Sequence, residues 1–204
     1  MLRRRSDNNG VHQAQREAVA DAAELAERRL LGQVAARELP AFDALYREYH
    51  PRLARFLDRM TRRANLVDEL LNDTMLVVWN RAERYNGQCK VSTWIFAIAY
   101  RKALKALDRL DEPVEDDDAD SHLSSEPGPE QRVGLQQLQA ALQRALAGLS
   151  VEQRAVVDLT YFHGADYREI AQIVDCPVDT VKTRMFHARR RLKTLLGGCL
   201  EDWE

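Results

Sequence analysis

The stretch from Tyr167 to Leu196 reads YREIAQIVDCPVDTVKTRMFHARRRLKTLL, and it decides the fold prediction. Asp166 and Glu169 at its start form the pattern of a capping box, followed by apolar residues at helical spacing. Residues 175–177, Asp-Cys-Pro, interrupt that spacing. Because proline is tolerated at the opening of a helix, a second helix is expected to begin close to Val178. Two short helices joined by a turn of about three residues are typical of proteins that place a helix in the DNA major groove.

The second helix is expected to have an apolar face and a polar, basic face. The residues expected to pack on the domain are Val181, Met185, Ala188, Leu192 and Leu195. The opposite face carries Asp179, Lys182, Thr183, Phe186, His187 and Arg190, flanked by Arg184, Arg189, Arg191 and Lys193. Cations neutralise phosphates, while short polar and aromatic groups reach base edges and thymine methyls. The alternative is a solvated basic face, in which Asp179 only favours the helix dipole.

Length and charge agree with a DNA-associated protein. The 204 residues allow two small domains, and 45% hydrophobic content is enough for modest cores. The formal net charge is only -2, so any basic surface must be local.

The chain lacks the sequence patterns of a metal site, a membrane span or an enzyme. Cys89, Cys176 and Cys199 are widely spaced without a CxxC pair, which argues against zinc and disulfides and favours a reducing cytoplasm. No apolar run approaches the roughly 20 residues that cross a bilayer. No nucleophile-base pair, glycine-rich phosphate loop or carboxylate dyad indicates catalysis, and no cofactor is expected.

Composition divides the chain into two modules. Residues 111–130, DEPVEDDDADSHLSSEPGPE, hold nine acidic residues and no lysine or arginine, and are interpreted as a flexible linker. Its charge either keeps it extended or places it in a positively charged channel of a partner. The linker separates a domain of residues 30–110 from one of residues 131–197, with a C-terminal tail of residues 198–204. Residues 1–29 form an extension with weak periodicity, expected to be disordered or a frayed helix.

The N-terminal module is predicted to be all-helical. Apolar residues keep helical spacing from Phe42 to Met60 across Pro51, which is expected to kink or divide one long helix. A second helix is expected from about Leu66 to Arg84. Its buried side is marked by Leu66, Leu70, Val77, Val78 and Trp79, and its first half carries the acidic patch Asp68, Glu69, Asn72 and Asp73. The patch either favours the helix dipole or docks a basic partner.

Residues 85–93, YNGQCKVST, are predicted to be a polar loop centred on Asn86-Gly87. Ser92 or Thr93 is expected to cap a third helix, whose basic side carries Arg101, Lys102, Lys105 and Arg109. A basic helix beside a loop with aromatics and amides is typical of a surface that binds single strands. Trp94 taken alone is more typical of a core residue.

Four segments together carry a family resemblance. They are FDALYREYHPRLARFL (42–57), VDELLNDTMLVVWNRAERYN (67–86), STWIFAIAYRKALKALDRL (92–110) and LAGLSVEQRAVVDLTYFHGADYREIAQIVDCPVDTVKTRMFHARRRL (146–192). In this order and separation they resemble the second and fourth conserved domains of bacterial extracytoplasmic-function (ECF) sigma factors of the sigma-70 family. The resemblance implies an all-α fold of two small domains, a sigma2-like helical bundle and a sigma4-like helix-turn-helix domain, joined by the acidic linker.

The resemblance also implies partners and site residues. The acidic helix would bind the β′ clamp helices of core RNA polymerase, through Asp68, Glu69, Asn72, Asp73, Val77 and Trp79. The single-stranded minus-ten element would be held by Arg84, Tyr85, Asn86, Lys90, Ser92, Thr93, Trp94, Arg101 and Lys102. The double-stranded minus-thirty-five element would be read by Asp179, Thr180, Lys182, Thr183, Arg184, Phe186, His187 and Arg190. Further implied partners are the β flap of the polymerase and an anti-sigma factor, which could hold the otherwise cytoplasmic, nucleoid-associated protein at the membrane.

The chain departs from the family pattern at three positions. Asn72 and Asp73 stand where the family often has Gln and Glu, so each side chain is one methylene shorter. Asp179 stands where glycine is frequent, and a carboxylate there would repel phosphate and alter promoter choice. Two other functions remain as alternatives: a dimeric helix-turn-helix regulator that binds duplex DNA without polymerase, and a protein that only sequesters other factors.

Overall fold

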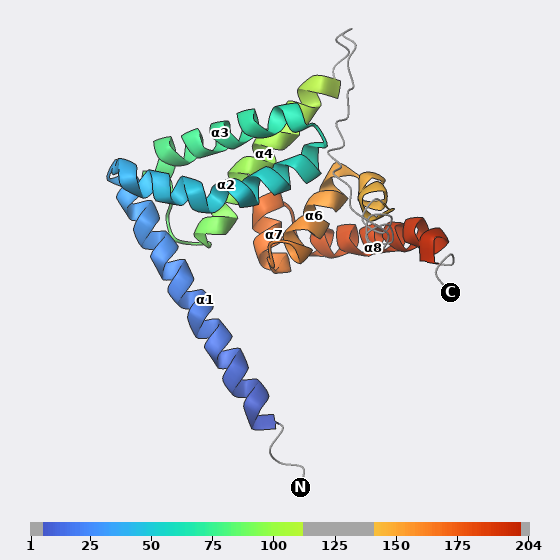
Figure 1. The fold of residues 1–204 in the computed structure, drawn as a ribbon, viewed down its shortest axis with the longest axis horizontal. Coiled ribbons are helices and arrows are strands. Elements are labelled where there is room, and N and C mark those ends of the chain that lie inside the picture. Colours follow the sequence, from blue (N-terminus) through green and yellow to red (C-terminus); the bar gives the residue numbers. More distant parts are fainter. Residues whose placement is uncertain (1–5, 112–140, 201–204) are drawn as a thin grey trace, which may run out of the picture.

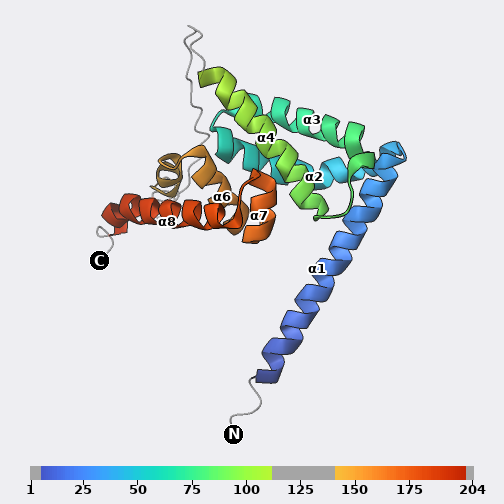
Figure 2. The ribbon, with the colours of Figure 1, turned by 180° about the vertical axis from the view of Figure 1, so that it is seen from behind.

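The computed structural model describes residues 6–111 and 141–200, and these residues form helices and turns without a strand. The predicted all-α class is therefore confirmed. In chain order the helices are α1 (Ser6–Ala35), α2 (Leu39–Thr61), α3 (Ala64–Arg81), the 3-10 helix η1 (Ala82–Arg84), α4 (Val91–Asp111), α6 (Val151–Tyr161), α7 (Tyr167–Val174) and α8 (Val178–Leu200). Residues 141–147 are also helical. Figures 1 and 2 show α2, α3 and α4 as one group, with α6, α7 and α8 beside it.

The first group forms around the apolar face of α2. Tyr49, Phe56 and Leu57 on this face are fully buried, and the Phe56 ring meets Phe96 of α4 edge to face at 5.2 Å between centroids. Burial of one such side chain contributes roughly 1.5–3 kcal/mol. The face therefore holds α3 and α4 against α2.

Helix α1 continues through the predicted boundary at residue 30. Leu31 and Val34 are buried, so the last turns of α1 belong to the same core as α2. The earlier part of α1 projects away from the body of the molecule (Figure 1).

Pro51 does not divide the helix in which it lies. The structure keeps one helix from Leu39 to Thr61 with Pro51 inside it, so of the two expected effects, a kink or a division, the division does not occur. Tyr49 and Leu53 on either side are buried in the core. The packing of this face outweighs the loss of one backbone hydrogen bond at an exposed position.

The second helix ends earlier than predicted and the third begins earlier. Helix α3 ends at Arg81, and η1 supplies the last turn to Arg84. Helix α4 begins at Val91, so Ser92 and Thr93 lie inside it and do not cap it. Within the loop, Gly87 has a φ of 74°, as the Asn-Gly turn requires.

The second domain confirms the predicted helix-turn-helix. Asp166 caps α7 by accepting hydrogen bonds from Arg168 N and Glu169 N, and the Glu169 side chain accepts from Asp166 N. Helix α8 begins at Val178 as predicted. Val181, Met185 and Ala188 are buried and Leu192 packs against the core, whereas Leu195 is 39% exposed although its side chain lies beside Gly148.

The acidic segment 111–130 and the start of the second domain at residue 131 lie outside the described residues, apart from the last residue of α4. The C-terminal tail 198–204 lies outside them too, except for the end of α8.

Candidate nucleic-acid interface

The start of α8 presents an ion pair to solvent. Lys182 Nζ donates to Asp179 Oδ1 at 2.9 Å, one helical turn apart, and the Asp179 side chain is 90% exposed. The Thr183 hydroxyl donates to the Asp179 carbonyl at 2.9 Å. Thr180, the residue after Asp179, is half-buried. The carboxylate thus neutralises the first cation of the helix rather than standing alone.

The next turn of α8 exposes aromatic groups. Phe186 is 63% exposed, and its ring meets that of His187 at 5.5 Å in an edge-on arrangement. Arg190 is exposed one turn further on. An exposed apolar ring beside cations is suited to contact a thymine methyl in the major groove.

Arg184 lies apart from this exposed face. Its Nη1 donates to Cys176 Sγ at 3.8 Å, and the side chain is half-buried. The pKa of Tyr100 in α4 is raised, chiefly by burial, and nearby Arg184 opposes that rise. Arg184 therefore lies between α8 and the first domain, separated from the other residues predicted to face DNA.

The loop before α4 is ordered by its own side chains. The Tyr85 hydroxyl donates to the Cys89 carbonyl, and the Asn86 side chain accepts from Gln88 N at 3.1 Å. Tyr85 also packs against Trp94 at 5.7 Å between centroids, while Arg84 is exposed. The structure thus places Tyr85 of the loop against Trp94 of α4, while the Asn86 side chain orders the turn of the same loop.

Two of the residues predicted at the minus-ten surface are not free in the structure, since one is buried and the other is paired with a carboxylate. Thr93 is 3% exposed inside α4, and Lys102 donates to Asp73 Oδ2 of α3 at 2.7 Å. Ser92 is half-buried and Arg101 is exposed. Glu24 of α1 accepts from Val91 N at 3.3 Å and so supplies the helix cap that Ser92 or Thr93 was expected to supply.

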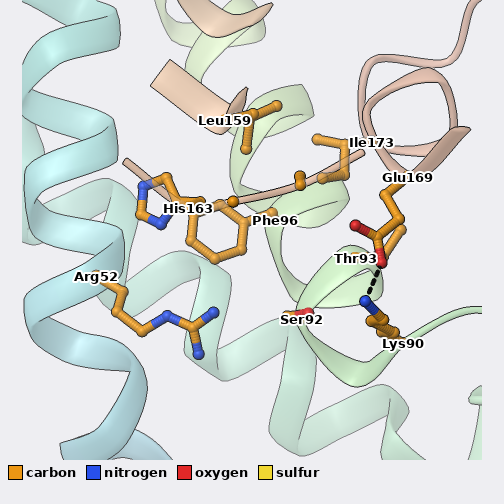
Figure 3. A pocket seen from close by; sticks show the side chains of 11 residues that line it. Arg52, Lys90, Ser92, Thr93, Phe96, Leu159, His163, Glu169 and Ile173 are labelled. Carbon is orange, nitrogen blue, oxygen red and sulfur yellow. Dashed lines mark ion pairs between the residues drawn. The ribbon is translucent and has the colours of Figure 1, made fainter. Parts of the chain in front are cut away.

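Lys90 bridges the two domains. Its Nζ lies 2.5 Å from Glu169 Oε1 of α7, and this hydrogen bond raises the pKa of Lys90 (Figure 3). Ser92, Thr93 and Phe96 line the same small pocket with Glu169. Nothing in the spacing of the sequence indicated this contact.

The acidic helix α3 keeps two free carboxylates. Asp68 and Glu69 are exposed in its first turns. Asn72 accepts a hydrogen bond from the Tyr46 hydroxyl at 3.0 Å, and Asp73 pairs with Lys102 as described above. Val77 and Trp79 are half-buried, with Trp79 edge-on to Phe42 at 5.1 Å. Among the described residues, Asp68 and Glu69 are the members of the patch that have no hydrogen-bond or ion-pair partner.

Within the described residues, no group of His, Cys, Asp and Glu is arranged to hold a metal ion. In the same part of the chain, no helix has both the length and the apolar character that a membrane crossing needs.

Comparisons with known proteins match both domains. The model of sigma-70 region 2 matches residues 45–112, and the model of sigma-70 region 4 matches residues 139–192. The chain is 32% identical to the ECF RNA polymerase sigma factor RpoE of Cereibacter sphaeroides, over 77% of this chain and 87% of that protein. It is also 32% identical to the ECF RNA polymerase sigma factor SigM of Mycobacterium tuberculosis, over 85% of this chain and 86% of that protein.

Solved structures support the fold. CnrH in complex with the cytosolic domain of CnrY aligns with a TM-score of 0.62 at 23% identity, over 85% of this chain and 98% of that one. The sigma factor RpoE of Bartonella quintana, in complex with the anti-sigma factor NepR, aligns with a TM-score of 0.58 at 21% identity, over 76% of this chain and 97% of that one. The two matched regions, in this order on an all-helical fold, identify the chain as a member of the ECF RNA polymerase sigma factor family.

Proposed function

We propose that this chain is a non-enzymatic initiation factor that binds core RNA polymerase, recognises two promoter elements and helps to melt the duplex. The observation that carries the proposal is the pairing of two features in one chain. The second domain has an exposed basic and aromatic recognition helix, and the first domain has a loop and an acidic helix that suit single-stranded DNA and polymerase. A helix-turn-helix domain alone would be compatible with an ordinary DNA-binding regulator. The match to sigma-70 region 2 in the first domain favours an initiation factor over such a regulator.

The minus-thirty-five element is assigned to the exposed face of α8. Lys182, Thr183, Phe186 and His187 contact bases, and Arg190 contacts phosphate. Asp179 and Thr180 complete the start of this surface. Arg184 joins it only when α8 moves away from the first domain, because its guanidinium lies beside Cys176 and Tyr100.

The minus-ten element is assigned to the loop before α4 and to the start of that helix. Tyr85, Asn86 and Trp94 offer stacking faces and an amide, and Arg84, Lys90 and Arg101 supply positive charge. Ser92, Thr93 and Lys102 support this surface from within, since each is half-buried, buried or paired.

Core polymerase is assigned to the acidic face of α3. Asp68 and Glu69 are free to meet a basic partner, whereas Asn72 and Asp73 are held by Tyr46 and Lys102 and must exchange partners to reach it. Val77 and Trp79 set the shape of this face. A cytoplasmic location, a contact with the β flap and control by an anti-sigma factor complete the proposal.

A binding experiment separates this function from that of a stand-alone regulator. Promoter fragments selected with core polymerase plus the chain are retested with each component alone. We expect sequence-specific retention only with both components present. Specific binding of the duplex by the chain alone would contradict the proposal and favour the stand-alone regulator.

A matched pair of alanine variants locates the contact. Lys182→Ala removes an exposed cation of the recognition helix and is expected to weaken promoter binding by roughly tenfold or more. Arg55→Ala removes an exposed cation of α2 that lies outside the proposed surfaces and is expected to change binding little. Equal effects of the two variants would overturn the assignment of α8.

A further inference from the structure

Helix α1 borders the loop before α4, which consists of residues 85–90. The helix contacts both η1 and α4, and both ribbon views place it beside the start of α4 (Figures 1 and 2). The residues that make this contact belong to the segment 1–29, which was interpreted as an extension before the first domain. The end of that segment is therefore built into the domain.

The orientation of α1 on the domain is fixed by polar and apolar contacts on one face. Leu31 is buried in the core. One turn earlier, Glu27 Oε2 accepts a hydrogen bond from the Tyr49 hydroxyl at 2.9 Å, and Arg52 Nη1 lies 3.6 Å from Glu27 Oε1. Residues three or four apart share a face of a helix, so the same face carries Glu24 toward the loop.

Glu24 binds the start of α4. Its Oε1 accepts hydrogen bonds from Val91 N at 3.3 Å and from Arg28 Nε at 2.8 Å, and its side chain is only 19% exposed. The first N–H groups of a helix have no partner within it, and a carboxylate there also meets the positive end of the helix dipole. Trp94 N donates to the Lys90 carbonyl at 3.1 Å, so the helix opens directly at the end of the loop. Glu24 thus fixes the point at which the loop continues into α4.

Arg28 lies against the turn of the same loop. A Cβ atom on Gly87, whose φ is 74°, would lie 3.8 Å from Arg28 Nη1. Burial raises the pKa values of Tyr85 and Cys89, and the nearby Arg28 guanidinium opposes both rises. Arg28 is therefore held by Glu24 on one side and reaches the loop with the other.

The loop has an inner edge toward the protein and an outer edge toward solvent. Residues 85, 87 and 89 are half-buried, whereas residues 86, 88 and 90 are exposed. The contacts of Arg28 involve the inner set, so they leave the amides of Asn86 and Gln88 on the outer edge. Amides beside an aromatic platform are the groups that an unstacked base needs.

We propose that Glu24 and Arg28 are positioning residues for promoter opening, which hold the loop before α4 in the conformation that receives the separated strand. Neither residue needs to contact a base. A loop that is already ordered loses less conformational entropy when the strand binds, so the strand binds more tightly. This inference rests on the proposed function for its consequence in opening, but the ordering of the loop is a property of the free chain.

Four variants separate positioning from general stability. Glu24→Ala removes the acceptor of Val91 N, whereas Glu24→Gln keeps an amide oxygen in the same place. Arg28→Ala removes the guanidinium beside the loop and leaves the acceptor. The matched control is Asp43→Ala, which breaks an i,i+4 ion pair with Arg47 in α2, the same kind of pair as that of Glu24 with Arg28.

Amide hydrogen exchange on the free full chain, followed by mass spectrometry, measures the order of the loop. We expect Glu24→Ala to speed exchange in peptides that cover residues 85–94 about three- to tenfold, and Arg28→Ala about threefold. Glu24→Gln should change it by less than about twofold, and Asp43→Ala should leave it unchanged. Unchanged exchange in peptides from α7 and α8 shows that each variant is folded. Unchanged exchange of the loop in Glu24→Ala would overturn the proposal.

The kinetics of promoter opening by the polymerase complex give the functional arm. Fluorescence of 2-aminopurine placed in the minus-ten element follows opening. The dependence of the rate on the concentration of the complex separates initial binding of the duplex from the maximal rate of opening. We expect Glu24→Ala to lower the maximal rate about three- to tenfold with initial binding unchanged, and Glu24→Gln to restore the rate to within about twofold. Equal losses in both quantities, or no recovery with Glu24→Gln, would contradict the positioning role.

Failure of this inference and failure of the proposed function give different results. Faster exchange of the loop with an unchanged maximal rate of opening would overturn the positioning role and leave the proposed function intact. No opening with any variant or with the unmodified chain would contradict the proposed function. Hydrogen exchange on the free chain would still decide whether α1 orders the loop.

Discussion

At the scale of single residues, three cations of the surfaces proposed to bind DNA are paired with carboxylates within the chain. Lys182 is held by Asp179, Lys102 by Asp73 and Lys90 by Glu169, so three cations expected at DNA surfaces are each neutralised in the free protein. Such pairs lower the non-specific attraction to phosphate. DNA must therefore compete with a carboxylate at each of these positions.

Asp179→Asn tests this competition at the recognition helix. Loss of the carboxylate frees Lys182 and removes a repulsion toward phosphate, so we expect the polymerase complex to bind its promoter about two- to five-fold more tightly. Selection from a library randomised in the minus-thirty-five element should also show a changed base preference near this contact. An unchanged affinity and an unchanged preference would place Asp179 outside the DNA surface.

Arg154→Ala tests the cap that one domain places on the other. The carbonyls of Met60 and Leu149 lose their donor, and we expect the free energy of unfolding to fall by about 1–3 kcal/mol. Urea unfolding followed by circular dichroism measures the change. Arg47→Ala, at an exposed position, serves as the matched control and should stay within about 0.5 kcal/mol of the unmodified chain. Equal stability of the two variants would mean that the guanidinium is dispensable.

At the scale of elements, local patterns predicted the second domain better than the first. The capping box of α7 and the start of α8 follow from residues that are neighbours in sequence, and both predictions are confirmed. The start of α4 was misplaced because its cap, Glu24, lies 67 residues upstream in α1. Pro51 does not divide α2, because the buried face around it keeps the helix continuous.

Asp166→Ala tests how far α7 depends on its cap. The substitution removes the acceptor of two backbone hydrogen bonds, and we expect a loss of about 1 kcal/mol of stability. Asp166→Asn keeps an oxygen acceptor and should lose only a few tenths of a kcal/mol. Thermal unfolding of the two variants is compared. An equal loss of stability in the two variants would show that α7 is stabilised by the negative charge of Asp166 and not by the hydrogen bonds of its cap.

Glu69→Lys tests the assignment of α3 to polymerase. Reversal of a free carboxylate that faces a basic partner is expected to weaken binding of core polymerase by about tenfold or more, with a stronger effect at low salt. Glu48→Lys makes the same change on exposed α2 and should leave the affinity nearly unchanged. Equilibrium titration of labelled chain with core polymerase supplies both values. A larger loss for Glu48→Lys would move the docking surface from α3 to α2.

At the scale of the whole molecule, the two domains were predictable and their contact was not. Each domain carries its own apolar periodicity, and the matches to regions 2 and 4 fall on the two modules. Arg154 and Asp158 occupy ordinary helical positions, and their partners in α2 lie 94 to 99 residues away. No local pattern encodes such a pairing, so the contact between the two domains emerges only from the structure.

Promoter-specific initiation is the central claim, and transcription in vitro on a genomic DNA library tests it most directly. Core polymerase with the purified chain should produce transcripts whose start sites share an upstream and a downstream element, and core polymerase alone should not. Lys182→Ala should lose these transcripts while Arg55→Ala retains them. Random start sites with an active polymerase and a folded chain would contradict the account.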